Sequence, residues 1–479
     1  MKNYISTLAA SLLFVSAANA QVGEPFIHDP ATLAYCEGKY YTFGTGGGGL
    51  VSEDGWTWHK GPNCNFQRGA APDVLKIGDR YLVAYSATGG GLGGSHKGEV
   101  RTMWTKSFDP ESPDYGYTDF NVVATSVDGE DCDAIDAGLL LDPTTGRLWC
   151  SYGTYFGNIR IVELDPDTGA RLEGNEPVDI AIDCEATDLI YRGGWYYLLG
   201  THGTCCDGPN STYNIVVGRS RNVTGPYIDN MGRDMMKGGG KMVIAAHDRV
   251  TGPGHFGRTI IEDGVEIMTC HFEADFDRGG YSTLGIRPLL WKNDWPVAGK
   301  VFKEGVYEIE SVRRGYAVEL SVDFVRIETE RRRFWGVDPE IAKKKIPEQK
   351  LEDVIAGWPK GDIIVRACDY MFRPNQKWTI KAAEDKGGYL GAPYYTIMIE
   401  GTERALAVGE NDSIIAVEKY TGADEQLWRI EQLIDGTYRI MPKAQGETQK
   451  VLMSAGDSNL TLGVFNVNDD NVKWNLNLL

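Results

Sequence analysis

The chain has 479 residues, a formal net charge of −19, 59 glycines and 11% aromatic residues. The negative charge argues against nucleic acid or an anionic membrane as the main partner, and it disfavours a strongly acidic polymer as substrate. A neutral substrate stays open, and the length predicts two domains.

Residues 1–20 form a predicted secretory signal. Lys2 precedes an apolar run from Leu8 to Ala17, and Ala18-Asn19-Ala20 forms a cleavage site before Gln21. The run is too short for a permanent membrane helix, and no later stretch approaches that length. We therefore expect an exported protein, periplasmic or extracellular, with no membrane insertion.

From Gln21 to about Val301, short apolar and aromatic runs alternate with glycine-rich turns, which predicts an all-β domain. An acidic residue precedes such a run four times at intervals of roughly 45 to 60 residues, as in a propeller with one blade per repeat. These residues are Asp29, Asp73, Asp136 and Glu185. Because the innermost strands of a propeller surround one channel, we expect these carboxylates to meet at one end of it.

The segment Gly285–Trp291 is predicted to be the last strand of this domain. Pairing of the first and last strands would close the ring and bring the segment near Asp29. After Lys300 the composition changes, and a dense run of charges at 328–352 predicts an inserted, partly helical surface segment near 322–356.

Tryptophans recur at strand ends in the C-terminal part, within Gln376-Lys377-Trp378, Gln426-Leu427-Trp428 and Val472-Lys473-Trp474. This threefold Q-x-W pattern resembles the ricin B-type β-trefoil of the family 13 carbohydrate-binding modules. The resemblance implies a β-trefoil over 302–479. The third copy lacks its glutamine and the charged segment stretches the first, so sugar binding by those two lobes is not implied. A purely structural trefoil stays the alternative.

The nine cysteines have irregular spacing that matches no zinc pattern and no small disulfide scaffold. Export permits disulfides. Cys205 and Cys206 form either a vicinal disulfide or two buried thiols, and no thiol stands out as a nucleophile.

Cleaving a glycosidic bond between neutral sugars requires one carboxylic acid to protonate the leaving oxygen and one carboxylate to activate water. A third carboxylate near the acid keeps it protonated, because like charges disfavour ionisation. Asp29, Asp136 and Glu185 would meet this need. Each alone could be a turn residue or a surface charge, but their recurrence in blade register favours catalysis.

Eight segments together resemble the blade motifs of glycoside hydrolase family 43, in the branch of arabinanases and arabinofuranosidases. They are His28-Asp29-Pro30, Ala71-Pro72-Asp73-Val74, Ala134-Ile135-Asp136, Cys184-Glu185-Ala186, the stretch 205–213, Gly218-Arg219-Ser220, Thr224-Gly225-Pro226-Tyr227 and Gly252-Pro253-Gly254-His255. The resemblance covers residues 22 to 300. It implies a five-bladed β-propeller over 21–301 and an inverting mechanism.

The resemblance also implies a role for each matched residue. Asp29 would be the general base, Glu185 the general acid, and Asp136 the residue that orients the acid and raises its pKa. Base and acid would lie about 6.5 to 9.5 Å apart, which leaves room for a water. Asp73 would line the pocket without transferring a proton.

His255 matches the histidine that helps to hold a hydrated cation, usually calcium, in the central channel of the arabinanase-like members. Calcium prefers oxygen ligands, so one histidine with waters is a weak site. No organic cofactor is implied.

The chain departs from the family pattern at Ala70, Ala137 and Thr187, where tryptophan, proline and proline are usual. The carboxylates remain, so activity is still expected, but the walls that select the substrate can differ. Candidates for substrate contact, with core packing as the alternative for the aromatic ones, are Trp56, Tyr155, Phe156 and Arg287.

We therefore expect an exported, monomeric, inverting hydrolase that acts on arabinose-containing plant cell-wall polysaccharide or oligosaccharide, as an exo-acting α-L-arabinofuranosidase. Endo-arabinanase is the nearest alternative, followed by exo-β-galactosidase and β-xylosidase, because fold does not decide substrate. A non-catalytic glycan-binding protein is the alternative from another class, and the three retained carboxylates argue against it.

Overall fold

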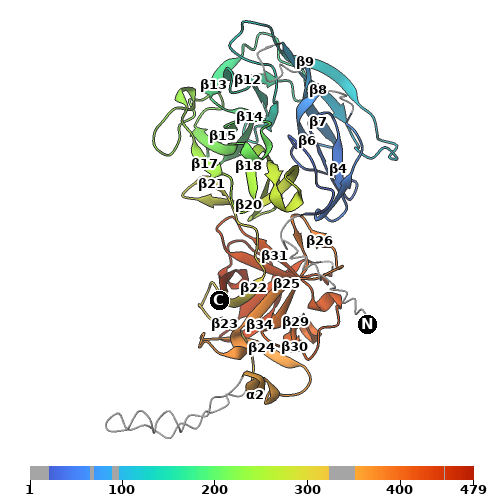
Figure 1. Ribbon diagram of the computed structural model, residues 1–479, viewed down its shortest axis with the longest axis vertical. Helices are drawn as coiled ribbons and strands as arrows, with labels where there is room; N and C mark the ends of the chain where they lie inside the picture. The colour runs from blue at the N-terminus through green and yellow to red at the C-terminus, as the bar shows by residue number, and fades with distance from the viewer. Residues whose placement is uncertain (1–20, 65–68, 89–96, 323–350, 447) are drawn as a thin grey trace, which may run out of the picture.

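Two β-rich parts lie end to end along the long axis of the computed structural model (Figure 1). The structure describes residues 21–64, 69–88, 97–322, 351–446 and 448–479. The predicted signal and most of the predicted charged insertion lie outside these ranges.

Five sheets of four antiparallel strands, the first with one further short strand, make up the first part, which confirms the five-bladed propeller. The first sheet contains β1 (Val22–Gly23), β2 (Ala34–Cys36), β3 (Lys39–Phe43), β4 (Gly49–Ser52) and β5 (Thr57–Lys60). The second contains β6 (Ala70–Ile77), β7 (Arg80–Thr88), β8 (Gly98–Thr105) and β9 (Thr118–Ser126). The third contains β10 (Gly138–Leu141), β11 (Leu148–Tyr152), β12 (Asn158–Leu164) and β13 (Val178–Ile182).

The remaining two sheets follow in chain order. The fourth contains β14 (Glu185–Arg192), β15 (Trp195–His202), β16 (Asn214–Ser220) and β17 (Lys241–Ile244). The fifth contains β18 (Val250–Glu262), β19 (Val265–Asp275), β20 (Tyr281–Lys292) and β21 (Trp295–Ala298). The innermost strands of neighbouring sheets are in contact, as β6 with β10, β10 with β14 and β14 with β18.

The middle strands are buried on both faces because each sheet packs against its neighbours. All eleven residues of β19 are buried, and β11 is buried along its whole length. One hydrophobic layer joins Leu82 and Trp104 of the second sheet to Leu148 and Val162 of the third. Strands that are covered on both faces are typically rich in β-branched and aromatic residues. These layers fix the spacing of the innermost strands and thus of any residue carried on them.

The ring is closed by the N-terminal segment. The amide of Ile27 donates to the carbonyl of Ser282 at 3.3 Å, and the amide of Leu284 donates to the carbonyl of Pro25 at 2.8 Å. The chain then enters the first sheet, so the two ends of the propeller are joined. The segment Gly285–Trp291, predicted to be the last strand, lies instead in β20, the third strand of the fifth sheet, and β21 follows it.

The second part is a β-trefoil, as expected, built around three buried tryptophans. The indoles of Trp378, Trp428 and Trp474 are 0% exposed. Each donates a hydrogen bond to a strand carbonyl, of Val318, Leu406 and Leu452 respectively, at 2.8 to 2.9 Å. The tryptophans are therefore core residues in all three lobes, and sugar binding by the trefoil stays a prediction.

The strands of the trefoil lie mostly in one large sheet. They are β22 (Gly305–Ser311), β23 (Ala317–Leu320), β24 (Ile363–Cys368), β25 (Trp378–Ala382), β26 (Gly388–Tyr389), β27 (Ala392–Pro393), β28 (Tyr395–Ile399), β29 (Ala405–Val408), β30 (Ile414–Val417), β31 (Trp428–Gln432), β32 (Tyr438–Pro442), β33 (Lys450–Ala455), β34 (Asn459–Val464) and β35 (Trp474–Leu478).

Helical structure is sparse in the described ranges. It comprises α2 (Leu351–Ala356) and the short 3-10 turns η1 (Gly208–Asn210), η2 (Met235–Lys237), η3 (Phe276–Arg278), η4 (Pro374–Gln376), η5 (Glu410–Asp412), η6 (Asp424–Gln426) and η7 (Asp470–Val472). None of these described helices has the length and apolar character needed to cross a membrane.

The two parts are joined by backbone and side-chain contacts. The amide of Gly391 donates to the carbonyl of Gly55 at 3.0 Å, and the amide of Trp291 donates to the carbonyl of Ile434 at 2.8 Å. The buried Arg439 of the trefoil pairs with Glu262 at the end of β18. The trefoil is thus attached to the first and last sheets of the propeller.

Candidate active site

Each innermost strand has a residue with a left-handed backbone where it enters the central channel. The φ angles are 52° at Asp29, 45° at Ala71, 58° at Asp136, 45° at Ala186 and 59° at His255. Such angles are uncommon for residues other than glycine and concentrate at functional sites. In β6, β14 and β18 they coincide with β-bulges, which redirect side chains. The same local kink therefore orients the side chains of successive blades toward one place.

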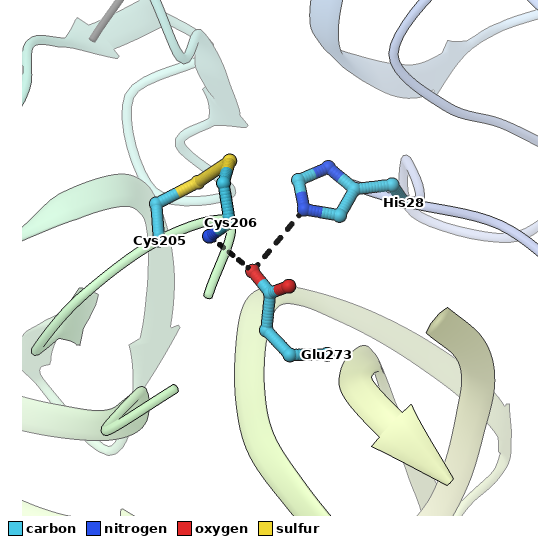
Figure 2. A group of neighbouring side chains, drawn as sticks. All are labelled: His28, Cys205, Cys206 and Glu273. Atoms are coloured by element: carbon cyan, nitrogen blue, oxygen red, sulfur yellow. Dashed lines mark hydrogen bonds and ion pairs between the residues drawn. A yellow bond between two sulfur atoms is a disulfide. The ribbon is translucent and has the colours of Figure 1, made fainter. Parts of the chain in front are cut away.

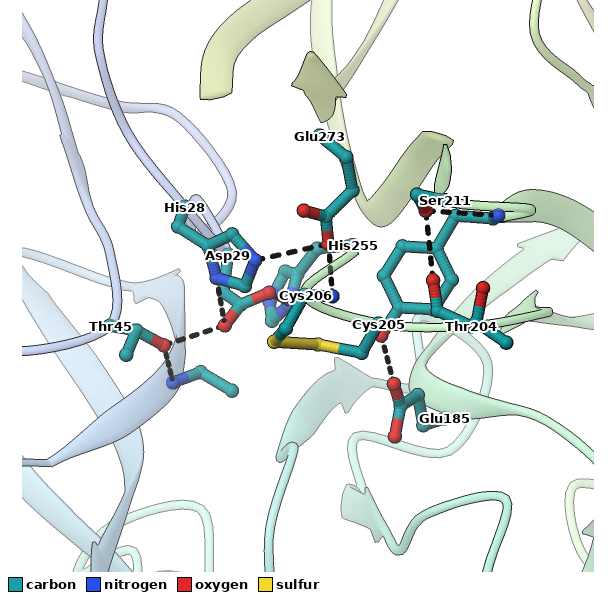
Figure 3. The surroundings of a disulfide bond; sticks show 12 residues. His28, Asp29, Thr45, Glu185, Thr204, Cys205, Cys206, Ser211, His255 and Glu273 are labelled. Atoms are coloured by element: carbon teal, nitrogen blue, oxygen red, sulfur yellow. Dashed lines mark hydrogen bonds and ion pairs between the residues drawn. A yellow bond between two sulfur atoms is a disulfide. The ribbon is translucent and has the colours of Figure 1, made fainter. Parts of the chain in front are cut away.

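Asp29 lies just ahead of β2, and Figure 3 shows His28 and His255 beside it. Its Oδ2 is 2.8 Å from Nδ1 of His28 and accepts a hydrogen bond from Thr45 at 2.6 Å. Its Oδ1 lies 3.7 Å from Nδ1 of His255 and 3.6 Å from Nδ1 of His271. Burial alone would raise the pKa of Asp29, but His255 and His28 hold it well below its usual value. Asp29 is therefore a carboxylate near neutral pH.

The pKa of Glu185, the first residue of β14, is shifted in the opposite direction. Its side chain is buried, and its Oε1 accepts a hydrogen bond from the hydroxyl of Tyr213. Burial and the negative charge of Asp29 raise the pKa of Glu185 to about 8, although the hydrogen bond from Tyr213 opposes the shift. Glu185 therefore carries a proton at neutral pH.

Asp136 is next to Glu185. Its amide donates to Ser86 Oγ at 3.1 Å, and its Oδ2 accepts from the amide of Ala186 at 3.2 Å. Burial, then the charges of Glu185 and Asp29, raise the pKa of Asp136 well above its usual value. Because Asp136 and Glu185 disfavour each other's ionisation, the pair retains a proton that an isolated carboxyl group would lose.

Asp73, predicted to line the pocket, has both carboxylate oxygens engaged by backbone amides. Oδ1 accepts from Thr32 at 3.3 Å, and Oδ2 accepts from Leu139 at 2.9 Å. Thr32 precedes β2 and Leu139 is in β10, so Asp73 in β6 ties three successive blades together. This buried carboxylate holds the innermost strands in place.

Of the predicted aromatic contacts, Tyr155 is within electrostatic range of Glu185, and Phe156 packs against Tyr155. Burial and the charge of Glu185 raise the pKa of Tyr155. The ring of Phe156 packs against that of Tyr155, with centroids 4.6 Å apart, and Phe156 is 52% exposed. The pair offers an aromatic surface at the edge of the acidic cluster.

Trp56 and Arg287 do not lie in this cluster. Trp56 precedes the outer strand β5, is buried, and packs against Gly388 of the trefoil. Arg287, in the third strand of the fifth sheet, is stacked over the ring of Phe272 and lines a cavity of about 870 Å³ together with Lys300. Alternating sequence patterns do not distinguish outer strands from inner ones, which explains both misplacements.

His255, the predicted cation ligand, is buried in β18. Burial opposes its protonation, but Asp29 and Asp136 raise its pKa. Its Nδ1 has no hydrogen-bond partner among the described residues. Two groups of described residues have ligand atoms close enough to share a metal, and His255 is in neither. The described residues thus do not build a calcium site of protein oxygens around His255.

Four residues that the sequence analysis did not single out complete the site, and Figure 2 shows two of them, His28 and Glu273. His28 joins Asp29 to Glu273, whose Oε1 is 3.2 Å from His28 Nε2. Tyr213 contacts Glu185, and His271 Nδ1 accepts the amide hydrogen of Asp29 at 2.9 Å. His28 and Glu273 are 245 positions apart, so only the folded ring brings them together, and no sequence signal could have paired them.

Cys205 and Cys206 form a disulfide. Of the two possibilities that the sequence left open, a vicinal disulfide or two buried thiols, the structure has the disulfide. Cys205 is partly buried and Cys206 is exposed. The other described cysteines form no disulfide; six of them are buried and Cys368 is partly buried.

The arrangement can therefore perform acid–base chemistry with two carboxyl groups in different states. Asp29 is ionised and can accept a proton from water, while Glu185 is protonated and can donate one to a leaving oxygen. The two roles require opposite pKa shifts, and the neighbours of each residue provide them.

Known proteins share both parts of this chain. The model described as "Glycosyl hydrolases family 43" matches residues 42–296. The model described as "Ricin-type beta-trefoil lectin domain-like" matches residues 374–464.

Two curated relatives and one solved structure are similar to the propeller. An extracellular endo-alpha-(1->5)-L-arabinanase 1 of Bacillus subtilis is 30% identical over 325 residues, which are 61% of this chain and 95% of the relative. An extracellular exo-alpha-(1->5)-L-arabinofuranosidase of Cellvibrio japonicus is 31% identical over 328 residues, 61% of this chain and 91% of the relative. The crystal structure of an exo-1,5-alpha-L-arabinanase from a bovine ruminal metagenomic library matches with a TM-score of 0.53 and 31% identity, over 60% of this chain and 99% of that one.

Proposed function

This chain belongs to glycosyl hydrolase family 43, an inverting family, and from that membership we propose that it hydrolyses arabinose-containing plant polysaccharide. The observation that supports this most directly is the pairing of an ionised Asp29 with a protonated Glu185 in one buried cluster. The similar proteins from Bacillus subtilis and Cellvibrio japonicus carry arabinan-cleaving activities in their names.

In the proposed reaction, Asp29 removes a proton from a water that attacks the anomeric carbon. Glu185 donates its proton to the departing glycosidic oxygen, so the bond breaks with inversion. Asp136 holds Glu185 in its protonated state through like-charge proximity. The water becomes the new anomeric hydroxyl, and the two carboxyl groups exchange states once per turnover.

We propose exo action as an α-L-arabinofuranosidase, with endo-arabinanase as the second candidate. The exo-acting Cellvibrio japonicus relative supports the first and the endo-acting Bacillus subtilis relative supports the second. We also propose that the protein is exported, since both relatives are named extracellular, and that it acts as a monomer.

The test compares the wild type with Glu185→Gln on linear arabinan and on a panel of nitrophenyl glycosides. Loss of a general acid should slow release of reducing sugar by about 10²- to 10⁴-fold. Asp183→Asn is the control, because Asp183 is exposed and faces His202 at 3.3 Å. Equal rates for Glu185→Gln and wild type would refute the proposed function.

The products of the same assay distinguish the modes of action. Exo action releases arabinose from the first time points without a ladder of longer fragments, and endo action produces the ladder. Hydrolysis of a β-galactoside or β-xyloside alone would replace the arabinose assignment.

A further inference from the structure

One loop contacts the surroundings of both catalytic carboxyl groups. It comprises residues 203–213, which join β15 to β16. At its end, Tyr213 donates a hydrogen bond to Glu185. Near its start, the amide of Cys206 donates to Oε1 of Glu273 at 3.0 Å (Figure 3).

Glu273 transmits the second contact to the base. Its Oε1 is 3.2 Å from Nε2 of His28, and Nδ1 of His28 is 2.8 Å from Oδ2 of Asp29. Burial lowers the pKa of His28, but Asp29 and Glu273 outweigh it and raise the pKa to about 10. His28 is therefore a cation that donates from both ring nitrogens, one to each carboxylate. The amide of Cys206, Glu273, His28 and Asp29 form one continuous chain of hydrogen bonds.

The disulfide lies directly over this chain. A ring nitrogen of His28, the Sγ atoms of Cys205 and Cys206, and a carboxylate oxygen of Glu273 all lie within 4.8 Å of one another (Figure 2). Cys206 has a left-handed backbone, with φ at 61°, a conformation that a residue with a Cβ adopts only when its surroundings impose it. A covalent bond between adjacent side chains limits the rotation of the peptide that carries the Cys206 amide. The bond thereby keeps this amide directed at Glu273.

The rest of the loop is already fixed by polar contacts. The amide of Thr204 donates to Thr212 Oγ1 at 3.0 Å, and Ser211 Oγ donates to the carbonyl of Thr204 at 2.8 Å. The part between them, which carries the cysteines, is partly or fully exposed. A small reductant can therefore reach the sulfurs, and the disulfide is the element of the loop that can change state.

We propose that the Cys205–Cys206 disulfide is a redox-sensitive positioning element that holds Glu273 and His28 in the arrangement that orients the base Asp29. The proposal rests on the proposed function. Reduction by a dithiol or a phosphine breaks the S–S bond with two electrons, each sulfur takes up a proton, and the reductant is oxidised. Cys206 can then leave its left-handed conformation, and its amide moves away from Glu273.

The experiment compares oxidised wild type, phosphine-reduced wild type and the double variant Cys205→Ser/Cys206→Ser. Mass spectrometry after thiol alkylation verifies that two further thiols appear on reduction. We expect kcat to fall by roughly 10-fold or more, since small misplacements of catalytic groups are costly, with KM changed less than about 2-fold. Reductant should have no further effect on the double variant.

Cys368→Ser is the matched control, because Cys368 is a free, partly buried cysteine of the trefoil. This variant should respond to the reductant as the wild type does. If the disulfide had a merely structural role, its reduction would lower the melting temperature and leave kcat unchanged. Fully reduced wild type with unchanged kcat would overturn the proposal, even if the double variant fails to fold.

A second measurement does not depend on activity. Titration of the His28 ring followed by NMR should give a lower pKa after reduction, and Glu273→Gln should lower it as well. If the oxidised enzyme hydrolyses no arabinoside, the proposed function is wrong. The comparison of kcat between oxidised and reduced enzyme is then made with a glycoside that the enzyme does hydrolyse. An unchanged His28 titration after reduction would also count against the disulfide proposal.

Discussion

Asp29 is a partly buried carboxyl group and Glu185 a buried one, and their pKa values are shifted in opposite directions. The imidazoles of His255, His28 and His271 favour the charge of Asp29. Burial, and then the charge of Asp29, disfavours the charge of Glu185. Pairs of titratable groups with opposite shifts identify the acid and the base of an active site. Local electrostatics therefore support the proposed roles of Asp29 and Glu185 independently of the family resemblance.

The rate should depend on pH through these two groups. Activity requires protonated Glu185, so it should decline as pH rises through about 8. It also requires ionised Asp29, whose low pKa keeps the base ready down to weakly acidic pH. Tyr213→Phe removes the hydrogen bond that lowers the pKa of Glu185, so the alkaline limb should move to higher pH. A pH profile of kcat/KM measures this shift.

Tyr197→Phe is the control for that profile, because the hydroxyl of Tyr197 donates to the carbonyl of Asp294 at 2.7 Å, in an outer part of the propeller. Its alkaline limb should coincide with that of the wild type. An alkaline limb of Tyr213→Phe that stays in place or moves to lower pH would contradict the role given to this hydrogen bond.

Calcium at His255 stays a prediction. An ion there would take one nitrogen from the protein and its other ligands mostly from water, so binding should be weak. We expect EDTA to reduce activity and added calcium to restore it, with His255→Ala insensitive to both. If EDTA left the activity of the wild type unchanged, the prediction that calcium is needed for the reaction would be wrong.

At the scale of the strand, the separation of β10 and β14 decides how Asp136 and Glu185 meet. Gly138 is in β10, and a Cβ at this position would collide with the carbonyl of Thr187 in β14. Gly138→Ala should push the two strands apart, lower stability by about 1–3 kcal/mol and reduce kcat. Thermal unfolding and steady-state kinetics measure the two effects.

Gly48→Ala is the matched control, because a Cβ at Gly48 would meet no atom of the described residues within 4 Å. It should behave as the wild type in both measurements. If Gly138→Ala were equally active and stable, the close approach of β10 and β14 would not control the site.

The repeated acidic residues could be predicted from sequence because each blade reuses the same position. Asp29, Asp136 and Glu185 each recur before a strand and are brought together by the ring. His28 and Glu273 could not be found in this way, since their partnership exists only across the closed ring. The stretch 205–213 of this loop was recognised as a motif, but its role follows from three-dimensional contacts.

The sequence also could not show whether a strand is an inner or an outer strand of its blade. Trp56 precedes an outer strand, and its aromatic character equally suits a core position or a sugar platform. It packs against the trefoil, whose relation to the propeller no repeat in the sequence could reveal. Tyr155, in the turn after β11, lies close enough to Glu185 for the charge of that residue to raise its pKa, and substrate contact by Tyr155 and Phe156 stays a prediction.

At the scale of the whole molecule, Arg439 links the two parts. It is 1% exposed and pairs with Glu431 in the trefoil and with Glu262 in the propeller. Glu262→Ala should lower stability by about 1–3 kcal/mol, because a buried cation loses one partner. In scanning calorimetry, the single transition expected for the wild type should broaden or split.

Glu403→Ala removes an exposed pair with Lys419 and should change stability by at most about 1 kcal/mol. It serves as the control for the buried pair. Equal effects of the two substitutions would show that Arg439 does not couple propeller and trefoil.

The closure of the ring by Pro25–Ile27 has a consequence for how the protein matures. These residues are synthesised among the first, but their partners Ser282–Leu284 come only at the end of the propeller. Contacts so distant in sequence form late in folding. A chain that is still being synthesised has not yet brought its acids together, so we expect catalytic competence to appear in one step, when the last blade pairs with the first.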